Sequence, residues 1–246
     1  MTEALATAWN VAGVAAVFAL AGAVKGLTGM GLPTVAVSLL GLWMAPLQAA
    51  ALLVAPSLAT NLAQCRGPHL RRLARMLWPA WLGLAAATVL APPWTAAVDA
   101  RVLLGVVLVL YGSWGLARPR LPDLRGSAGL AGFVAGSATG LVASATAVFA
   151  LPLVPFLQSL RLDKDEMVQA LGLGFTVATL SLALRIGAVA PGQLVGPGPA
   201  LAVVAAFLGM WLGTRLRGRI SAQAFQRSLL LTFILLGVAN LAKGLA

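Results

Sequence analysis

The sequence predicts an all-α, polytopic integral membrane protein of about 8–10 transmembrane or half-membrane helices in two inverted-topology repeats. Its composition, its recurring apolar runs and a degenerate internal repeat predict this fold class. Hydrophobic residues make up 60% of the 246 residues and charged residues only 9%, against about 25% charged residues in soluble domains. So few charges could not cover a soluble surface, and we expect residues 1–246 to form a single membrane domain in the lipid bilayer.

The apolar runs define ten segments, of which the second and seventh are short. A full crossing needs about 20 residues, so these two are interpreted as half-helices or as tilted, buried segments. The N-terminal stretch MTEALATAWN has no basic residue and is interpreted as part of the first span rather than as a signal peptide. The segments lie at about 8–24, 32–44, 47–65, 76–91, 100–117, 127–145, 148–160, 166–187, 198–214 and 224–243.

Basic residues orient these segments. Arginine and lysine gather in short cytoplasmic loops, and with ten crossings the basic loops fall inside while both termini fall outside. This pattern explains the net charge of +11, so no nucleic-acid partner is predicted. We expect a multi-pass protein of the bacterial inner membrane. The orienting residues are Arg66, Arg71, Arg72 and Arg75, then Arg118, Arg120 and Arg125, then Arg215, Arg217, Arg219 and Arg227.

An internal repeat divides the chain into two halves. ALLVAPSLATNLAQCR (51–66) aligns without a gap with ALGLGFTVATLSLALR (170–185), and WLGLAAATVL (81–90) aligns with FLGMWLGTRL (207–216). The first repeat covers about 8–117 and the second about 127–243. Each half holds five segments, an odd number, so the two halves enter the membrane from opposite sides, as in many secondary transporters.

Two irregular stretches occupy corresponding places in the halves. KGLTGMGLP (25–33) lies in the first and GLVASATAVFALP (140–152) in the second. Transporters with inverted repeats bind their substrate near the bilayer midplane, at broken helices in corresponding positions. Irregular backbone at this depth is tolerated where it is buried in protein or lines a cavity. These stretches are therefore the candidate substrate site.

The chain resembles the sulfite exporter TauE/SafE family of membrane permeases. The pattern GLTGMGLPTVAVSLLGLWMAPLQAAALLVAPSLATNLAQ carries the resemblance through its glycine-rich turn, proline, short apolar helix and polar-striped helix. A degenerate copy follows in the second half, which has Ala143, Ser144, Ala145 and Ala147 where the family commonly has glycines. The resemblance implies a permease for a small anion, exporting sulfite or an organosulfonate by alternating access. A channel, or a non-transporting assembly or sensor subunit, remains the alternative.

In the first half, the glycine-rich turn predicts a seat for an anion. Glycines allow close approach of a ligand, and proline suits the first turn of a helix whose N-terminus would face that anion. A lysine beside a membrane segment is a functional candidate, or else extends its charge to the headgroups. Thr28 is a hydroxyl donor, or else bonds back to its own helix. The candidate residues are Lys25, Gly26, Thr28, Gly29, Gly31 and Pro33.

Polar side chains on one helical face predict a cavity that both halves share. Ser57, Thr60, Asn61 and Gln64 follow the spacing i, i+3, i+4, i+7, and such a stripe lines a substrate path or bonds to a neighbouring helix. Arg185 would bind an anion through its planar donors or anchor the helix at the interface. The second half supplies Ser144, Thr146, Thr176, Thr179 and Arg185.

The sequence contains few side chains that could carry out catalysis or bind a metal. Cys65 is the single cysteine and His69 the single histidine, so no metal site or enzyme activity is predicted, and no cofactor is expected. All six acidic residues lie in loops or at segment ends, so coupling to protons would need a proton carried by the substrate itself, or an ion held by backbone and hydroxyl groups. Oligomeric state is left open, with a homo-oligomer among the expected partners.

Overall fold

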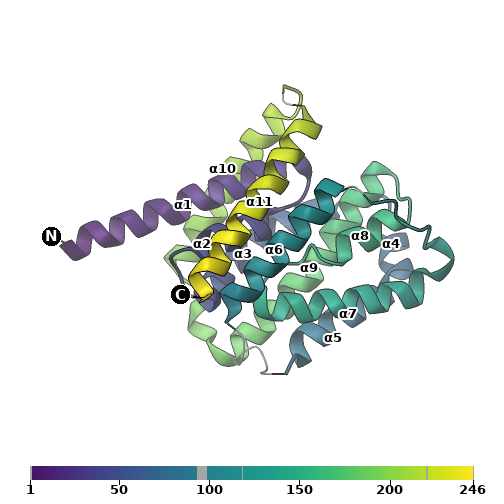
Figure 1. The fold of residues 1–246 in the computed structure, drawn as a ribbon, viewed down its shortest axis with the longest axis horizontal. Helices are drawn as coiled ribbons and strands as arrows, with labels where there is room; N and C mark the ends of the chain where they lie inside the picture. Colours follow the sequence, from purple (N-terminus) through teal and green to yellow (C-terminus); the bar gives the residue numbers. More distant parts are fainter. Residues whose placement is uncertain (1, 93–98, 118, 220, 246) are drawn as a thin grey trace.

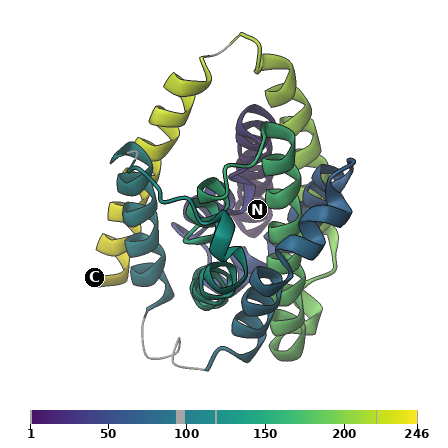
Figure 2. The same cartoon turned by 90° about the vertical axis from the view of Figure 1, so that its right-hand side faces the viewer.

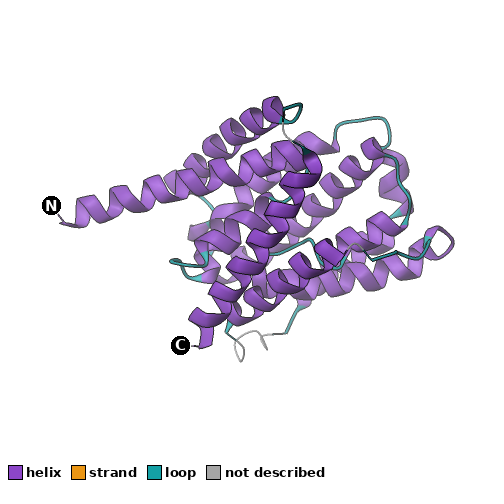
Figure 3. Cartoon of the chain, turned by 45° about the horizontal axis from the view of Figure 1, so that its top comes forward, coloured by secondary structure: helices purple, strands orange, loops and turns teal. Residues whose placement is uncertain are grey.

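A computed structural model describes residues 2–92, 99–117, 119–219 and 221–245, and within these ranges it contains helices and loops but no strand (Figures 1 and 3). This confirms the all-α prediction. Each of the ten predicted segments contains a helix, and α4 is an additional one. The helices are α1 (Thr2–Thr28), α2 (Leu32–Leu40), α3 (Pro46–Cys65), α4 (Leu70–Met76), α5 (Trp78–Leu90), α6 (Ala100–Ala117), α7 (Ala128–Thr146), α8 (Leu153–Ser159), α9 (Lys164–Val189), α10 (Pro197–Leu216) and α11 (Ala222–Leu245).

Seven helices in the described ranges are long and apolar enough to cross a membrane. They are α1, α3, α6, α7, α9, α10 and α11, and the pair α4 and α5 makes an eighth span if it counts as one helix bent by 67°. The chain is therefore a multi-pass membrane protein. Ten full helical crossings were not found, because α2 has 9 residues and α8 has 7, about 14 Å and 10 Å of helix.

The long helices pack in pairs. α1 lies along α10, α5 along α7 and α6 along α11, while α3 packs against α9. Figure 2 shows the α6–α11 pair standing apart at one side of the molecule. The short helices α2 and α8 pack against α3 and α9, respectively. Nearly all of their side chains are buried. The second and seventh segments, which contain α2 and α8 and which we call the broken segments, are therefore enclosed by protein rather than by lipid.

Glycines bring the backbones of the paired helices into contact. A Cβ atom at Gly22 would meet the carbonyl of Ala206, and one at Gly209 would meet the carbonyl of Ala19, so α1 and α10 touch along their backbones. A Cβ atom at Gly136 of α7 would likewise meet the carbonyl of Ala80 of α5. Small residues permit such contact in membranes, where lipid supplies no hydrophobic drive for association. These glycines therefore serve helix packing.

The basic loops share one end of the bundle, which we call the basic end. Arg72 pairs with Glu166 at the start of α9, and the guanidinium of Arg217 donates to the carbonyl of Leu27. At the opposite end, called the far end, Lys243 donates to the carbonyl of Leu42. The predicted clustering of basic loops on one side is therefore present in the described residues.

The two broken segments return the chain from one end of the bundle to the other. Leu27 contacts Arg217 before the start of α11, whereas Leu42 contacts Lys243 near its end. In the second half, the amide of Leu124, just before α7, donates to the carbonyl of Ser159 at the end of α8 (3.2 Å). Each short helix thus completes its return with non-helical backbone, which fits the interpretation of these segments as half-helices. The second irregular stretch begins later than the predicted 140–152, because α7 continues to Thr146.

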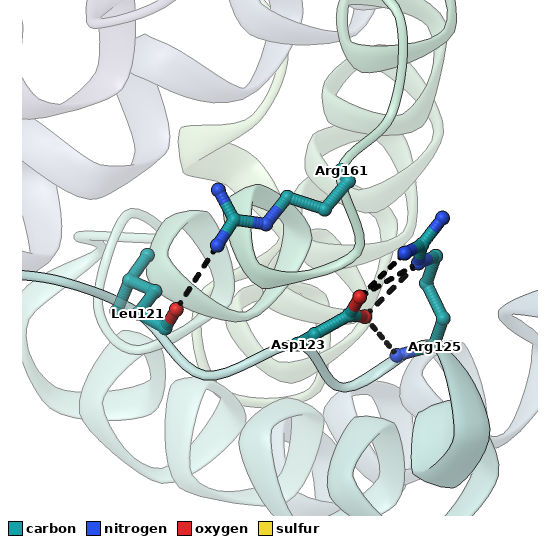
Figure 4. A network of polar contacts seen from close by, with 4 residues as sticks. All are labelled: Leu121, Asp123, Arg125 and Arg161. Atoms are coloured by element: carbon teal, nitrogen blue, oxygen red, sulfur yellow. Dashed lines mark hydrogen bonds and ion pairs between the residues drawn. The ribbon is translucent and has the colours of Figure 1, made fainter.

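The loop between α6 and α7 is held by a small polar network (Figure 4). Arg161 donates to the carbonyl of Leu121 (3.3 Å), which connects the end of α8 to this loop. Hydrogen bonds from Arg125 lower the pKa of the Asp123 carboxyl from its ordinary value to about 2. Asp123 therefore stays ionised at neutral pH and neutralises one of the cations at the basic end.

Replacement of Gly136 by alanine should destabilise the protein by about 1–3 kcal/mol, because the new methyl group would collide with the backbone of Ala80. Gly129 begins the same helix, and a methyl group added there would meet nothing within 4 Å. Gly129→Ala therefore serves as the matched control and should be neutral or slightly stabilising. The check is the midpoint of thermal unfolding in detergent. Equal midpoints for the two variants would contradict backbone contact between α5 and α7.

Candidate functional site

Lys25 is buried between α1 and α3. Its side chain is only 2% exposed, so it does not extend to the headgroups, the alternative that the sequence left open. Its Nζ donates to the hydroxyl of Thr60 at 3.1 Å and to the side-chain carbonyl of Asn61. Thr60 and Asn61 are themselves fully buried. Lys25 is thus in direct contact with two predicted site residues that lie 35 and 36 positions further along the sequence.

Further polar atoms around this cluster have no protein partner. They include the hydroxyl of Ser57, the amide nitrogen of Asn61 and the side-chain carbonyl of Gln64, all buried in the described structure. A buried polar group without a hydrogen bond costs about 1–3 kcal/mol, so such groups are usually paired with water or a ligand. We call Lys25, Ser57, Thr60, Asn61 and Gln64 the Lys25 cluster.

The glycine-rich turn next to the cluster starts α2. Gly29 and Gly31 have φ angles of 83° and 99°, a left-handed conformation that glycine adopts without strain. Pro33 stands in the first turn of α2, as predicted, and the amide of Gln64 donates to the carbonyl of Gly29 at 2.5 Å. The hydroxyl of Thr28 donates to the carbonyl of Val24 in its own helix and to that of Met30 in the turn. Thr28 therefore makes the bond back to its own helix that was the alternative to binding an anion.

A cavity of about 500 Å³ opens at the far end. The cations in its lining are Arg101 at the start of α6 and Arg185 near the end of α9, and its described lining contains no acidic side chain. Ser144 and Thr146, at the end of α7, also line it. Three predicted residues of the second half therefore share this cavity with an arginine that the sequence analysis missed.

The two arginines are held by backbone carbonyls and keep donors free. Arg185 donates from one terminal nitrogen to the carbonyls of Thr88 (3.3 Å) and Ala91 (2.8 Å) at the end of α5. Arg101 contacts the carbonyl of Met44 (3.5 Å), and its buried Nε has no partner. Because arginine keeps its charge when partly buried, both side chains give the far cavity a positive potential.

A second cavity of about 420 Å³ opens at the basic end. Thr28 and Gly31 of the glycine-rich turn line it together with Tyr111 of α6. Its cations are Lys164 and Arg217, and its described lining also lacks acidic residues. The loop preceding α2 therefore faces a cationic cavity, as expected for an anion seat at a helix N-terminus.

The two cavities meet α6 at places about 10 Å apart along its axis, and we call the protein between them the partition. Leu104 lines the far cavity and Tyr111 the basic-end cavity, and these residues are two turns apart on α6. Leu108, between them, is fully buried. Both cavities also touch α2, at Gly41 and Gly31 respectively. The cavities therefore lie one above the other along the same two helices.

The remaining predicted site residues lie away from both cavities. Gly26 faces α10, where a Cβ atom would meet the carbonyl of Met210. Thr176 and Thr179 donate to carbonyls of their own helix at 2.7 and 2.6 Å, and Thr176 lies 3.7 Å from the sulfur of Cys65. Arg101 and Arg217 were missed because their positions at segment ends are typical of orienting residues.

A double-mutant cycle should detect the contact between Lys25 and Asn61. Asn61→Leu leaves the Lys25 side chain with one fewer partner and should destabilise the protein. Lys25→Met combined with Asn61→Leu removes both polar groups. We expect a coupling of about 1–3 kcal/mol in unfolding free energy. The matched control pairs Lys25→Met with Asn240→Leu, a buried asparagine on α11. Additive effects in the first cycle would show that Lys25 and Asn61 do not interact.

The family described as Sulfite exporter TauE/SafE matches residues 14–240, which include both cavities and the Lys25 cluster. The search of curated proteins and the search of solved structures found no match. Because the matched region covers most of the chain, the protein belongs to the sulfite exporter TauE/SafE family of membrane transporters.

Proposed function

We propose that the protein is a permease that exports a small anion, sulfite or an organosulfonate, across the bacterial inner membrane. One observation carries the proposal. Two cavities open from opposite ends of the bundle, each lined by two cations and by no acidic side chain among the described residues. A cavity lined by one sign of charge raises the local concentration of the oppositely charged solute. Membership of the sulfite exporter family supports the same substrate class.

The closed partition favours a carrier over an open channel. On α6, Leu108 lies between the residues that line the two cavities and is fully buried, so we infer that a solute passes only after the helices move. Alternating access is the simplest movement of this kind, in which the partition opens toward one end at a time. A non-transporting subunit would have no need of two cationic cavities along the same pair of helices.

The packing of the helices supports an inverted repeat. If the halves correspond in order, α1 matches α7 and α5 matches α10, so the pairs α1–α10 and α7–α5 exchange places. Both pairs touch through glycine and backbone carbonyls. Likewise α3 would match α9 and α6 would match α11, and each of these forms a pair. We therefore propose repeats at about 8–117 and 127–243, and a cytoplasmic basic end.

Neutralising the far-cavity arginines should slow anion transport. The experiment measures the initial rate of sulfite release from liposomes containing the purified protein, against empty liposomes, for wild type and for Arg101→Gln with Arg185→Gln. We expect a rate at least about tenfold lower, equivalent to about 1.4 kcal/mol, because the cavity loses both cations. Arg71→Gln is the matched control, since Arg71 is exposed and lines neither cavity, and it should keep the wild-type rate.

Two results would contradict the proposal. Wild-type liposomes that release neither sulfite nor a set of short organosulfonates faster than empty liposomes would exclude a permease for these anions. Wild-type rates in the double arginine variant would show that the far cavity does not lie on the path. A folded, monodisperse sample of each variant is required for either conclusion.

A further inference from the structure

Lys25 is buried where the surrounding helices supply no counter-charge. Its partners, Thr60 and Asn61, are neutral. α1 packs against α2, α10 and α11 and is joined to α3 through Lys25. None of these four helices contains aspartate or glutamate. Their ionisable side chains are Cys65 on α3, Arg215 on α10, and Arg227 and Lys243 on α11.

The acidic residues closest in the fold are occupied or remote. α9 packs on α3 and carries its acids in its first turn, where Glu166 pairs with Arg72 and Asp165 is exposed. Glu3 is at the opposite end of α1 from Lys25. An ammonium buried without a counter-charge is strongly unfavourable. The empty cluster therefore favours the neutral amine, and a bound anion would favour the ammonium.

Free donors beside Lys25 suit the oxygen atoms of such an anion. The amide nitrogen of Asn61 and the hydroxyl of Ser57 lie one turn apart on α3 and have no partner in the protein. Lys25 is one turn from Thr28, which lines the basic-end cavity. An anion entering from that cavity would thus reach the Lys25 amine and two neutral donors after a shift of about one helical turn.

We propose that Lys25 binds one proton when the transported anion arrives and releases it when the anion leaves, so that anion and proton cross the membrane together. This inference rests on the proposed function. On loading, the lone pair of the Lys25 amine takes a proton from water, and the resulting ammonium pairs with the anion. On release, that N–H bond breaks and the proton returns to water on the other side. No bond of the anion changes.

This assigns the coupling role to a lysine. Proton-coupled transporters usually carry a carboxylate or histidine within the membrane, and all six acidic residues of this chain lie in loops or at the ends of the apolar segments. A buried lysine titrates readily when its surroundings change. When the carrier returns without an anion, Lys25 would be a neutral amine. The protein would then never have to move a buried ammonium that lacks a counter-charge.

The test compares sulfite release by wild type, Lys25→Arg and Lys25→Met between about pH 6 and about pH 10. Sulfite itself titrates in this range, but the ratio of two rates at the same pH cancels that effect. Arginine remains charged throughout. We expect the rate of the wild type relative to Lys25→Arg to fall at least about tenfold as pH rises, because only the lysine loses its proton. Lys25→Met should be slow at every pH.

A constant ratio of wild type to Lys25→Arg across the range would overturn the inference while leaving the proposed function intact. So would a Lys25→Met variant as fast as the wild type, which also decides the matter if Lys25→Arg does not fold. Absence of sulfite release by the wild type would instead contradict the proposed function.

Cys65 is the titratable group on α3, one turn beyond Asn61. Cys65→Ser therefore serves as the control, and it should reproduce the wild-type pH response. Loss of that response in Cys65→Ser, with Lys25 unchanged, would place the proton on the thiol and overturn the assignment to Lys25.

Discussion

Backbone contact at glycines is the constraint on which the rest of this structure depends. Lipid provides no hydrophobic force to press helices together, so close packing must supply the stability. Gly22, Gly209 and Gly136 bring paired helices near enough for backbone to touch backbone. The paired long helices in turn enclose α2 and α8, whose irregular flanks could not face lipid. Both cationic cavities lie beside α2, which contributes Val37 to the far cavity, while Gly31 at its start lines the basic-end cavity.

The fold was largely predictable, because membrane segments are marked by length and hydropathy. All ten segments contain a helix. The acidic start of α9 forms an N-terminal capping box, in which the amide of Asp163 donates to Glu166. α4 was missed because its arginines resemble a cytoplasmic loop. The bend between α4 and α5 has no signal in hydropathy; it lies next to Pro79 in the first turn of α5, where a proline suits the start of a new helix.

The site was less predictable, because it depends on helix rotation and on contacts between distant residues. Lys25 and Asn61 are 36 positions apart, and either could have faced lipid or a neighbouring helix without changing the sequence pattern. The glycine-rich turn was identified because glycine and proline restrict the local backbone in recognisable ways. Arg101 was missed because a cation at the end of a span is usually an orienting residue, and only the folded chain brings it beside Arg185.

The central claim is that the two cavities belong to one path whose partition opens to each end in turn. Labelling with a membrane-impermeant thiol reagent tests it most directly, using single cysteines at Ser144 and Thr28 in a Cys65→Ser background, added from either side of oriented vesicles. If the partition opens to one end at a time, Ser144→Cys should react only from the far end and Thr28→Cys only from the basic end. Sulfite should change both labelling rates. Labelling rates that sulfite leaves unchanged at both positions would contradict it.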